Sequence, residues 1–199
     1  MVKRGNPYPH KYKDGKQTKA IDFETFQEGM ESKKFSHPLR DGSYLAFIYW
    51  SGVRRSEAYE RVKKNFEVKD DILLCEVPAK KHGERGGSLR LPINLPYVNL
   101  ILERIEKTRL RYHPELKRKD KFVWPISDST AWRIVKRVFP GLYPHFFRLN
   151  RAVLFCQNPD TSDIDVKSWF GWKSSKTIDY YMGVSQRSMI RMSNRLKAE

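Results

Sequence analysis

Two short segments of the sequence pair an arginine with a second functional side chain. Arg54 and Glu57 lie three positions apart, so they share one face of a predicted helix and the carboxylate could hold the guanidinium still. His145 and Arg148 have the same spacing on the predicted first turn of another helix. Taken alone, each pair is more typical of a solvated surface, where an ion pair contributes little to stability.

Two further segments contain a candidate proton donor and a candidate nucleophile. Lys80 and Lys81 begin a basic, glycine-rich stretch that is predicted to form a hairpin loop, where lysines are usually solvated. Trp172 is followed by the adjacent Tyr180 and Tyr181, and such aromatic side chains normally belong to a core and its rim. None of these segments indicates catalysis by itself.

The elements that must position these residues follow from the apolar spacing. Helices are predicted over the ranges 22–30, 41–50, 54–63, 97–112, 129–139, 144–157 and a segment ending at 170, with shorter helical patterns at 176–181 and 186–197. Three short strands are predicted at 66–68, 72–77 and 89–93. The predicted fold class is α+β, mostly α-helical, with a small three-stranded antiparallel sheet.

The composition indicates one basic domain that attracts a polyanion. The 199 residues suffice for one domain with a real core, and the basic residues 1–20 are predicted to form a flexible arm. With 39 basic and 23 acidic residues, the formal net charge is +16. This excess attracts nucleic acid or, alternatively, an anionic membrane surface. No apolar run is long enough to span a bilayer and no signal peptide is recognisable, so we expect a cytoplasmic protein.

The cysteines and histidines give no sign of a metal site. Cys75 and Cys156 each lie in an apolar run, which predicts two buried and reduced thiols. None of the five histidines has metal-ligand spacing to a cysteine or to another histidine, so we expect no structural zinc.

Taken together and in their order, the four segments resemble the tyrosine recombinase or phage integrase family, which contains Cre, lambda integrase and the Xer recombinases. Segment 52–57 matches the family's G-x-R-x-S/x-E arginine motif, and 145–148 matches its H-x-x-R motif. A hairpin lysine lies between them. Gly171-Trp172 matches the later glycine with histidine or tryptophan, and Tyr181 follows Trp172 by the family's nine positions.

The resemblance implies that Tyr181 attacks a DNA phosphodiester and forms a 3′-phosphotyrosyl link, without metal, ATP or another cofactor. Arg54 and Arg148 would stabilise the negative charge that builds on the non-bridging oxygens. Lys80 would protonate the leaving 5′-oxygen, with Lys81 as the alternative.

The remaining roles also come from the resemblance. His145 would assist deprotonation of the tyrosine, and Trp172 would donate its indole N–H to a phosphate oxygen. Glu57 would brace the site, and Tyr180 is the alternative nucleophile. The residues expected to contact DNA are Lys81, Arg85, Arg55, Lys173 and Arg151.

The resemblance also sets expectations for organisation and role. Residues 21–199 would form the catalytic domain, with helix 184–198 either contacting another subunit or closing the domain. We expect no separate core-binding domain. We also expect a homo-oligomer, either a dimer or a tetramer, on double-stranded DNA. The expected role is a site-specific recombinase or integrase of a mobile genetic element. The alternatives are a type IB topoisomerase-like nicking-closing enzyme and a catalytically silent DNA-binding relative.

Overall fold

The computed structural model of the chain describes residues 21–32, 34–77, 87–108, 122–158, 160–174 and 178. The order of elements along these residues is α1 (Phe23–Glu31), α2 (Pro38–Ser51), α3 (Arg55–Tyr59), a 3-10 turn η1 (Lys63–Asn65), β1 (Phe66–Lys69), β2 (Ile72–Val77), β3 (Gly87–Pro92), α4 (Val98–Glu106), α5 (Asp128–Val138), α6 (Pro144–Gln157) and α7 (Asp163–Phe170). The predicted mostly helical α+β fold is therefore confirmed.

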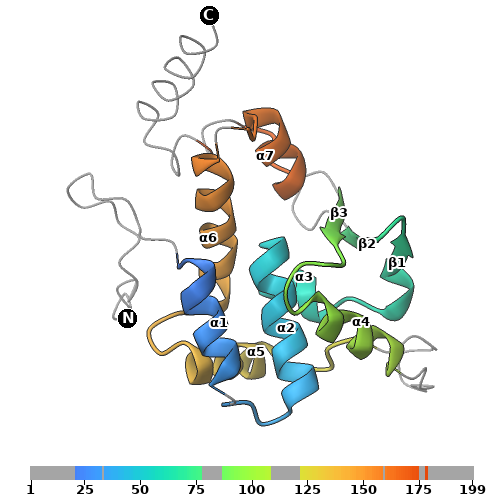
Figure 1. Cartoon of the computed structure of the whole chain (residues 1–199), viewed down its shortest axis with the longest axis vertical. Coiled ribbons are helices and arrows are strands. Elements are labelled where there is room, and N and C mark those ends of the chain that lie inside the picture. The colour runs from blue at the N-terminus through green and yellow to red at the C-terminus, as the bar shows by residue number, and fades with distance from the viewer. Residues whose placement is uncertain are drawn as a thin grey trace, which may run out of the picture.

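The sheet is antiparallel, with strand order β1-β2-β3, and it lies to one side of the helices (Figure 1). Cys75 on the central strand pairs with Phe66 on β1 and with Leu89 on β3. Leu73 and Leu91 form another buried pair across β2 and β3. Because side chains alternate between the two faces of a strand, these residues direct one face of the sheet into the core.

Helix α2 lies at the centre of the core and packs against α4 and α6. Its residues from 41 to 49 are all buried, as expected of a helix that is covered on every side. The helix begins at Pro38 rather than at Asp41, because proline suits the first helical position. Within the core, Phe26 of α1 stacks on Tyr49 with ring centroids 3.8 Å apart.

Two predicted helices are shorter in the structure. The helix predicted over 54–63 ends at Tyr59, because buried Arg61 turns inward and donates to the carbonyl oxygens of Glu57 and Glu76. The helix predicted over 97–112 ends at Glu106 within the described residues.

Several other predictions lie partly or wholly outside the described residues. They are the basic arm 1–20, the glycine-rich stretch after Pro78, and the helices 176–181 (except Ile178) and 186–197.

Both cysteines are free and buried, as predicted. Burial raises the pKa of the Cys75 thiol to about 12, because a low-dielectric surrounding penalises the thiolate. In the described part of the chain, no group of three or more histidine, cysteine, aspartate or glutamate side chains is arranged to hold a metal ion. Among the same residues, no helix combines the length and the apolar composition that crossing a bilayer would require.

Candidate active site

The candidate site begins where α2 ends. Gly52 caps α2 with a left-handed backbone (φ 63°), and its N–H donates to Ile48 O at 3.0 Å. Glycine is favoured at this position because it adopts positive φ without a steric penalty. Arg54 follows in an extended conformation and is the N-cap of α3. A sharp change of direction therefore places Arg54 between the two helices.

Glu57 binds Arg54 through both carboxylate oxygens. Arg54 Nη1 donates to Oε1 and the Arg54 backbone N–H donates to Oε2, each at 2.7 Å. The Glu57 side chain is only 5% exposed, whereas that of Arg54 is 21% exposed. The pair is therefore not the solvated surface ion pair that its spacing alone would favour. A buried carboxylate is costly unless cations and donors surround it.

Arg148 on α6 joins this pair from a distant part of the chain. Its Nη1 lies 3.8 Å from Glu57 Oε2, so one buried carboxylate serves both arginines. Nη1 also donates to Gly52 O at 3.2 Å, and Nη2 donates to Phe170 O at 3.1 Å. We call Arg54, Glu57 and Arg148 the arginine–glutamate cluster.

Two helix ends meet at Arg148. Gly52 caps α2, and Phe170 is the last residue of α7, which Gly171 caps with a second left-handed backbone (φ 67°). The carbonyl end of a helix carries partial negative charge and unpaired acceptors. A buried guanidinium at this point is therefore stabilised by both helices as well as by the carboxylate.

Aromatic rings form one wall of the cluster. Arg148 Cζ lies 4.8 Å from the centre of the Phe170 ring and 5.7 Å from that of Trp172. The two rings are stacked with centroids 4.6 Å apart. Cation–π contact holds the guanidinium plane in place, and it brings Trp172 beside the arginine. His145 is exposed one helical turn before Arg148 on α6.

The structure thus brings together Arg54, Glu57, Arg148 and Trp172 among the sequence-predicted site residues. The predicted nucleophile and proton donor, with their alternatives and one predicted DNA contact, lie outside the described residues: Tyr181, Tyr180, Lys80, Lys81 and Arg85.

The predicted DNA contacts within the described residues divide into two groups. Lys173 is exposed, and Arg55 is 43% exposed and pairs with Asp128 at 2.6 Å. Arg151, in contrast, is 8% exposed and donates from Nε and Nη2 to Tyr49 O at 3.1 and 3.0 Å. Its guanidinium binds the end of α2 inside the protein, and this arrangement gives no support to the predicted DNA contact of Arg151.

Two contacts of this region were not expected from the sequence. Arg151 binds the end of α2, as just described, and Trp169 Nε1 donates to Ser51 O at 2.7 Å. The spacing held a weak signal for Arg151, since it lies three positions after Arg148 on the same helix face. No pattern in the sequence singles out Trp169.

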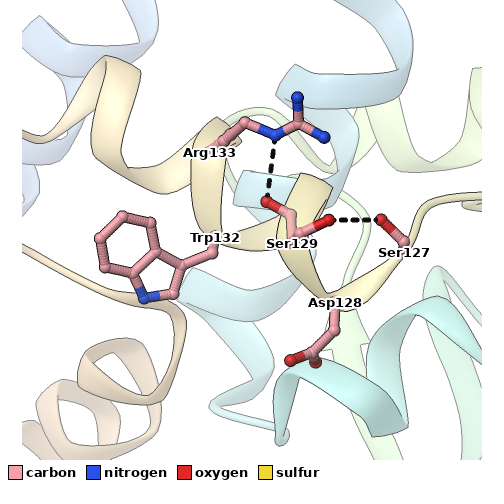
Figure 2. A pocket seen from close by; sticks show the side chains of 5 residues that line it. All are labelled: Ser127, Asp128, Ser129, Trp132 and Arg133. Atoms are coloured by element: carbon pink, nitrogen blue, oxygen red, sulfur yellow. Dashed lines mark hydrogen bonds between the residues drawn. The ribbon is translucent and has the colours of Figure 1, made fainter.

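A separate open pocket of about 560 Å³ lies at the start of α5 (Figure 2). It is lined by Ser127, Asp128, Ser129, Trp132 and Arg133. Arg133 Nε donates back to Ser129 O of its own helix at 3.4 Å. The pocket contains no member of the arginine–glutamate cluster. It adjoins α3 through Asp128, which pairs with Arg55 and accepts a hydrogen bond from the Tyr59 hydroxyl at 3.2 Å. It is therefore not the candidate phosphate site.

Gly52→Ala is expected to destabilise the fold by about 3 kcal/mol, from left-handed strain and from overpacking together. An added Cβ would lie 2.8 Å from Arg151 Cβ and 3.0 Å from Phe170 Cε1. Gly141→Ala is the matched control, because Gly141 also has positive φ (95°) but no atom within 4 Å of an added Cβ. Urea unfolding should show a clearly smaller loss for Gly141→Ala. Equal losses would contradict the packing argument.

Comparison with known proteins identifies the fold. Neither a family model nor a curated protein matches the sequence. Among solved structures, the chain is similar to the XerH site-specific recombinase bound to difH substrate in a pre-cleavage complex (TM-score 0.66, 18% identity, 83% of this chain and 50% of that one). It is also similar to XerH bound to palindromic difH in a post-cleavage complex (TM-score 0.66, 16% identity, 92% and 54%) and to the XerA recombinase (TM-score 0.57, 14% identity, 90% and 65%).

The fold is that of the tyrosine recombinase catalytic domain. The chain spans about half the length of the XerH chains that it matches and 65% of the XerA chain. At these identities the likeness concerns the fold, and the chemistry depends on the residues of this chain.

Proposed function

We propose that the chain cleaves and rejoins DNA strands through a covalent tyrosyl intermediate, as a site-specific recombinase or integrase. The observation that carries the proposal is the arginine–glutamate cluster: within a recombinase fold, Arg54 and Arg148 come from distant segments to share buried Glu57. Two guanidinium groups and one carboxylate give the cluster a formal charge of +1, which suits an anion. The partly exposed Arg54 is the side of the cluster that solvent, and hence a phosphate, can reach.

In the proposed reaction, the Tyr181 oxygen attacks the phosphorus of a DNA phosphodiester. The bond from phosphorus to the 5′-oxygen breaks, a 3′-phosphotyrosyl bond forms, and the 5′-oxygen leaves as a hydroxyl after taking a proton from Lys80 or Lys81. The tyrosine proton passes to a base, for which His145 is the candidate. Attack by a 5′-hydroxyl reverses the step, so the covalent intermediate keeps the bond energy and no ATP is consumed.

The arginines would act on the charge that develops at phosphorus. Each guanidinium presents a planar fork of donors that suits two non-bridging oxygens. Glu57, the helix ends and the aromatic wall hold Arg148 before substrate arrives, so little reorganisation is needed during the reaction. Trp172 lies beside Arg148 and would add an indole N–H to the same phosphate.

The end of the described chain supports Tyr181 as the nucleophile. Ile178, three positions before Tyr181, is buried in a cluster with Ala152 and Phe170. Phe170 is also the residue whose ring and carbonyl contact Arg148. The chain therefore returns to the neighbourhood of the cluster shortly before the tyrosine.

Double-stranded DNA is the proposed partner. The formal charge of +16 favours a polyanion, and XerH has been crystallised with its difH substrate. We also propose that the chain assembles into a homo-oligomer on DNA and acts as a recombinase or integrase of a mobile genetic element.

The test is covalent trapping of the chain on a library of nicked duplexes. A nick just 3′ of the scissile phosphate releases a short fragment, so rejoining fails and the adduct accumulates. We expect an adduct that survives denaturation and maps to a phosphotyrosyl peptide and a defined DNA site. DNA binding without any adduct would instead identify a silent relative. Relaxation of plasmids that lack the mapped site would indicate a nicking-closing enzyme.

A further inference from the structure

The end of α2, directly before Arg54, is held by two side chains that the proposed reaction does not use. The last carbonyl oxygens of a helix have no partner inside the helix. Tyr49 O accepts two hydrogen bonds from Arg151 on α6, and Ser51 O accepts one from Trp169 on α7. Both donors therefore bind the backbone of the segment from which Arg54 projects.

Arg151 is an unusual choice for a purely stabilising contact. It is 8% exposed, and its guanidinium lies 5.1 Å, 5.0 Å and 5.6 Å from the rings of Tyr49, Trp50 and Phe155. Burial lowers its pKa to about 10, because the charged form is desolvated. Among the described residues, no carboxylate forms an ion pair with it. A well-packed apolar side chain at such a site is often equally stabilising, so the charge is better explained by the position it imposes on the backbone.

The arrangement links the two halves of the arginine–glutamate cluster. Arg148 and Arg151 lie one turn apart on α6. Arg148 approaches Glu57 directly, while Arg151 holds the end of α2 that leads into Arg54 and Glu57. One helix thereby carries one arginine of the site and fixes the backbone that carries the other.

We propose that Arg151 and Trp169 are positioning residues, which set the place of Arg54 and Glu57 relative to Arg148. The inference rests on the proposed function, since DNA cleavage is what makes this placement matter. A displacement of about 1 Å in a catalytic constellation can lower the rate by about 100-fold.

The direct test is Arg151→Met, which removes the donors and keeps an unbranched apolar side chain. We expect covalent attachment to nicked DNA to slow by about tenfold or more, with DNA affinity unchanged. Amide hydrogen exchange should accelerate in residues 49–57, because the backbone there is no longer fixed. Arg151→Lys should recover part of the rate, since an ammonium can still donate to Tyr49 O.

Arg104→Met is the matched control. Arg104 on α4 is also partly buried and donates from Nε to a backbone carbonyl, that of Val123, at 2.6 Å. Arg104→Met therefore removes the same guanidinium donor, but from a carbonyl outside the segment that carries Arg54 and Glu57. At equal folded fraction, Arg104→Met should attach at the wild-type rate and leave exchange in 49–57 unchanged.

Two results would overturn the inference: wild-type attachment by folded Arg151→Met, or equal slowing in both methionine variants. If Arg151→Met does not fold, Trp169→Phe carries the same test, with Trp124→Phe as control because Trp124 donates to Ser43 Oγ away from the end of α2. Absence of any adduct from the wild type would instead refute the proposed function. In that case the exchange of 49–57 still decides whether Arg151 fixes this segment.

Discussion

Tyr181→Phe is expected to abolish covalent attachment to nicked DNA while leaving DNA affinity within about twofold of wild type. The substitution removes only the phenolic oxygen, which is the atom that forms the phosphotyrosyl bond in the proposed reaction. The ring remains, so packing and phosphate contacts made by other residues are retained. Denaturing electrophoresis of labelled DNA measures the adduct, and fluorescence anisotropy measures the affinity.

Tyr180→Phe is the matched control, because it removes the same atom one position away. It should attach to DNA at nearly the wild-type rate. Attachment by Tyr181→Phe together with its loss in Tyr180→Phe would identify Tyr180 as the nucleophile. Attachment by both variants would show that Tyr181 is not the sole nucleophile, and it would contradict the prediction based on the nine-residue spacing from Trp172.

Arg148→Lys is expected to lower the rate of DNA cleavage on the order of 100-fold or more. Lysine keeps the charge, but its single ammonium cannot reproduce the contacts to Glu57, Gly52 O and Phe170 O and also present a fork to a phosphate. Stability should fall as well, because buried acceptors at two helix ends lose their donors. The rate is measured in single turnovers on nicked DNA and corrected for the folded fraction.

Arg104→Lys separates loss of stability from loss of chemistry. Arg104 on α4 is partly buried and donates from Nε to Val123 O at 2.6 Å. In the described structure it contacts no member of the arginine–glutamate cluster. We expect some loss of stability but a cleavage rate within a few-fold of wild type. Equal loss of rate in the two variants would contradict a direct role for Arg148.

Local signals predicted the secondary structure wherever the relevant interactions are local. The bounds of α6 agree with the predicted range 144–157, because Pro144 marks its first turn. The strands of the β1–β2 hairpin were also found, with left-handed Asp70 and Asp71 between them. The length of α3 was not predictable in this way. It depends on buried Arg61, whose acceptor at Glu76 belongs to the sheet.

In the candidate site, too, the sequence predicted some features and contacts between distant segments decided others. The order of the motifs indicated that Arg54, Glu57, Arg148 and Trp172 belong together, and the described structure places them together. Their spacing could not show that Glu57 is buried, because α6 covers it from a distant part of the sequence. Burial is what turns a weak surface pair into a rigid support for two guanidinium groups.

Arg148 and Arg151 show what the sequence determined and what only the tertiary structure decided. The sequence by itself determined a mostly helical basic domain, the order of its motifs, and a helix that carries both arginines on one face. It predicted an anion contact for each of them. Only the tertiary structure decided that Arg148 meets Glu57 while Arg151 is buried at Tyr49 O. The reason is physical: helical spacing sets which side chains share a face, but the segments packed against that face decide which partner each of them meets.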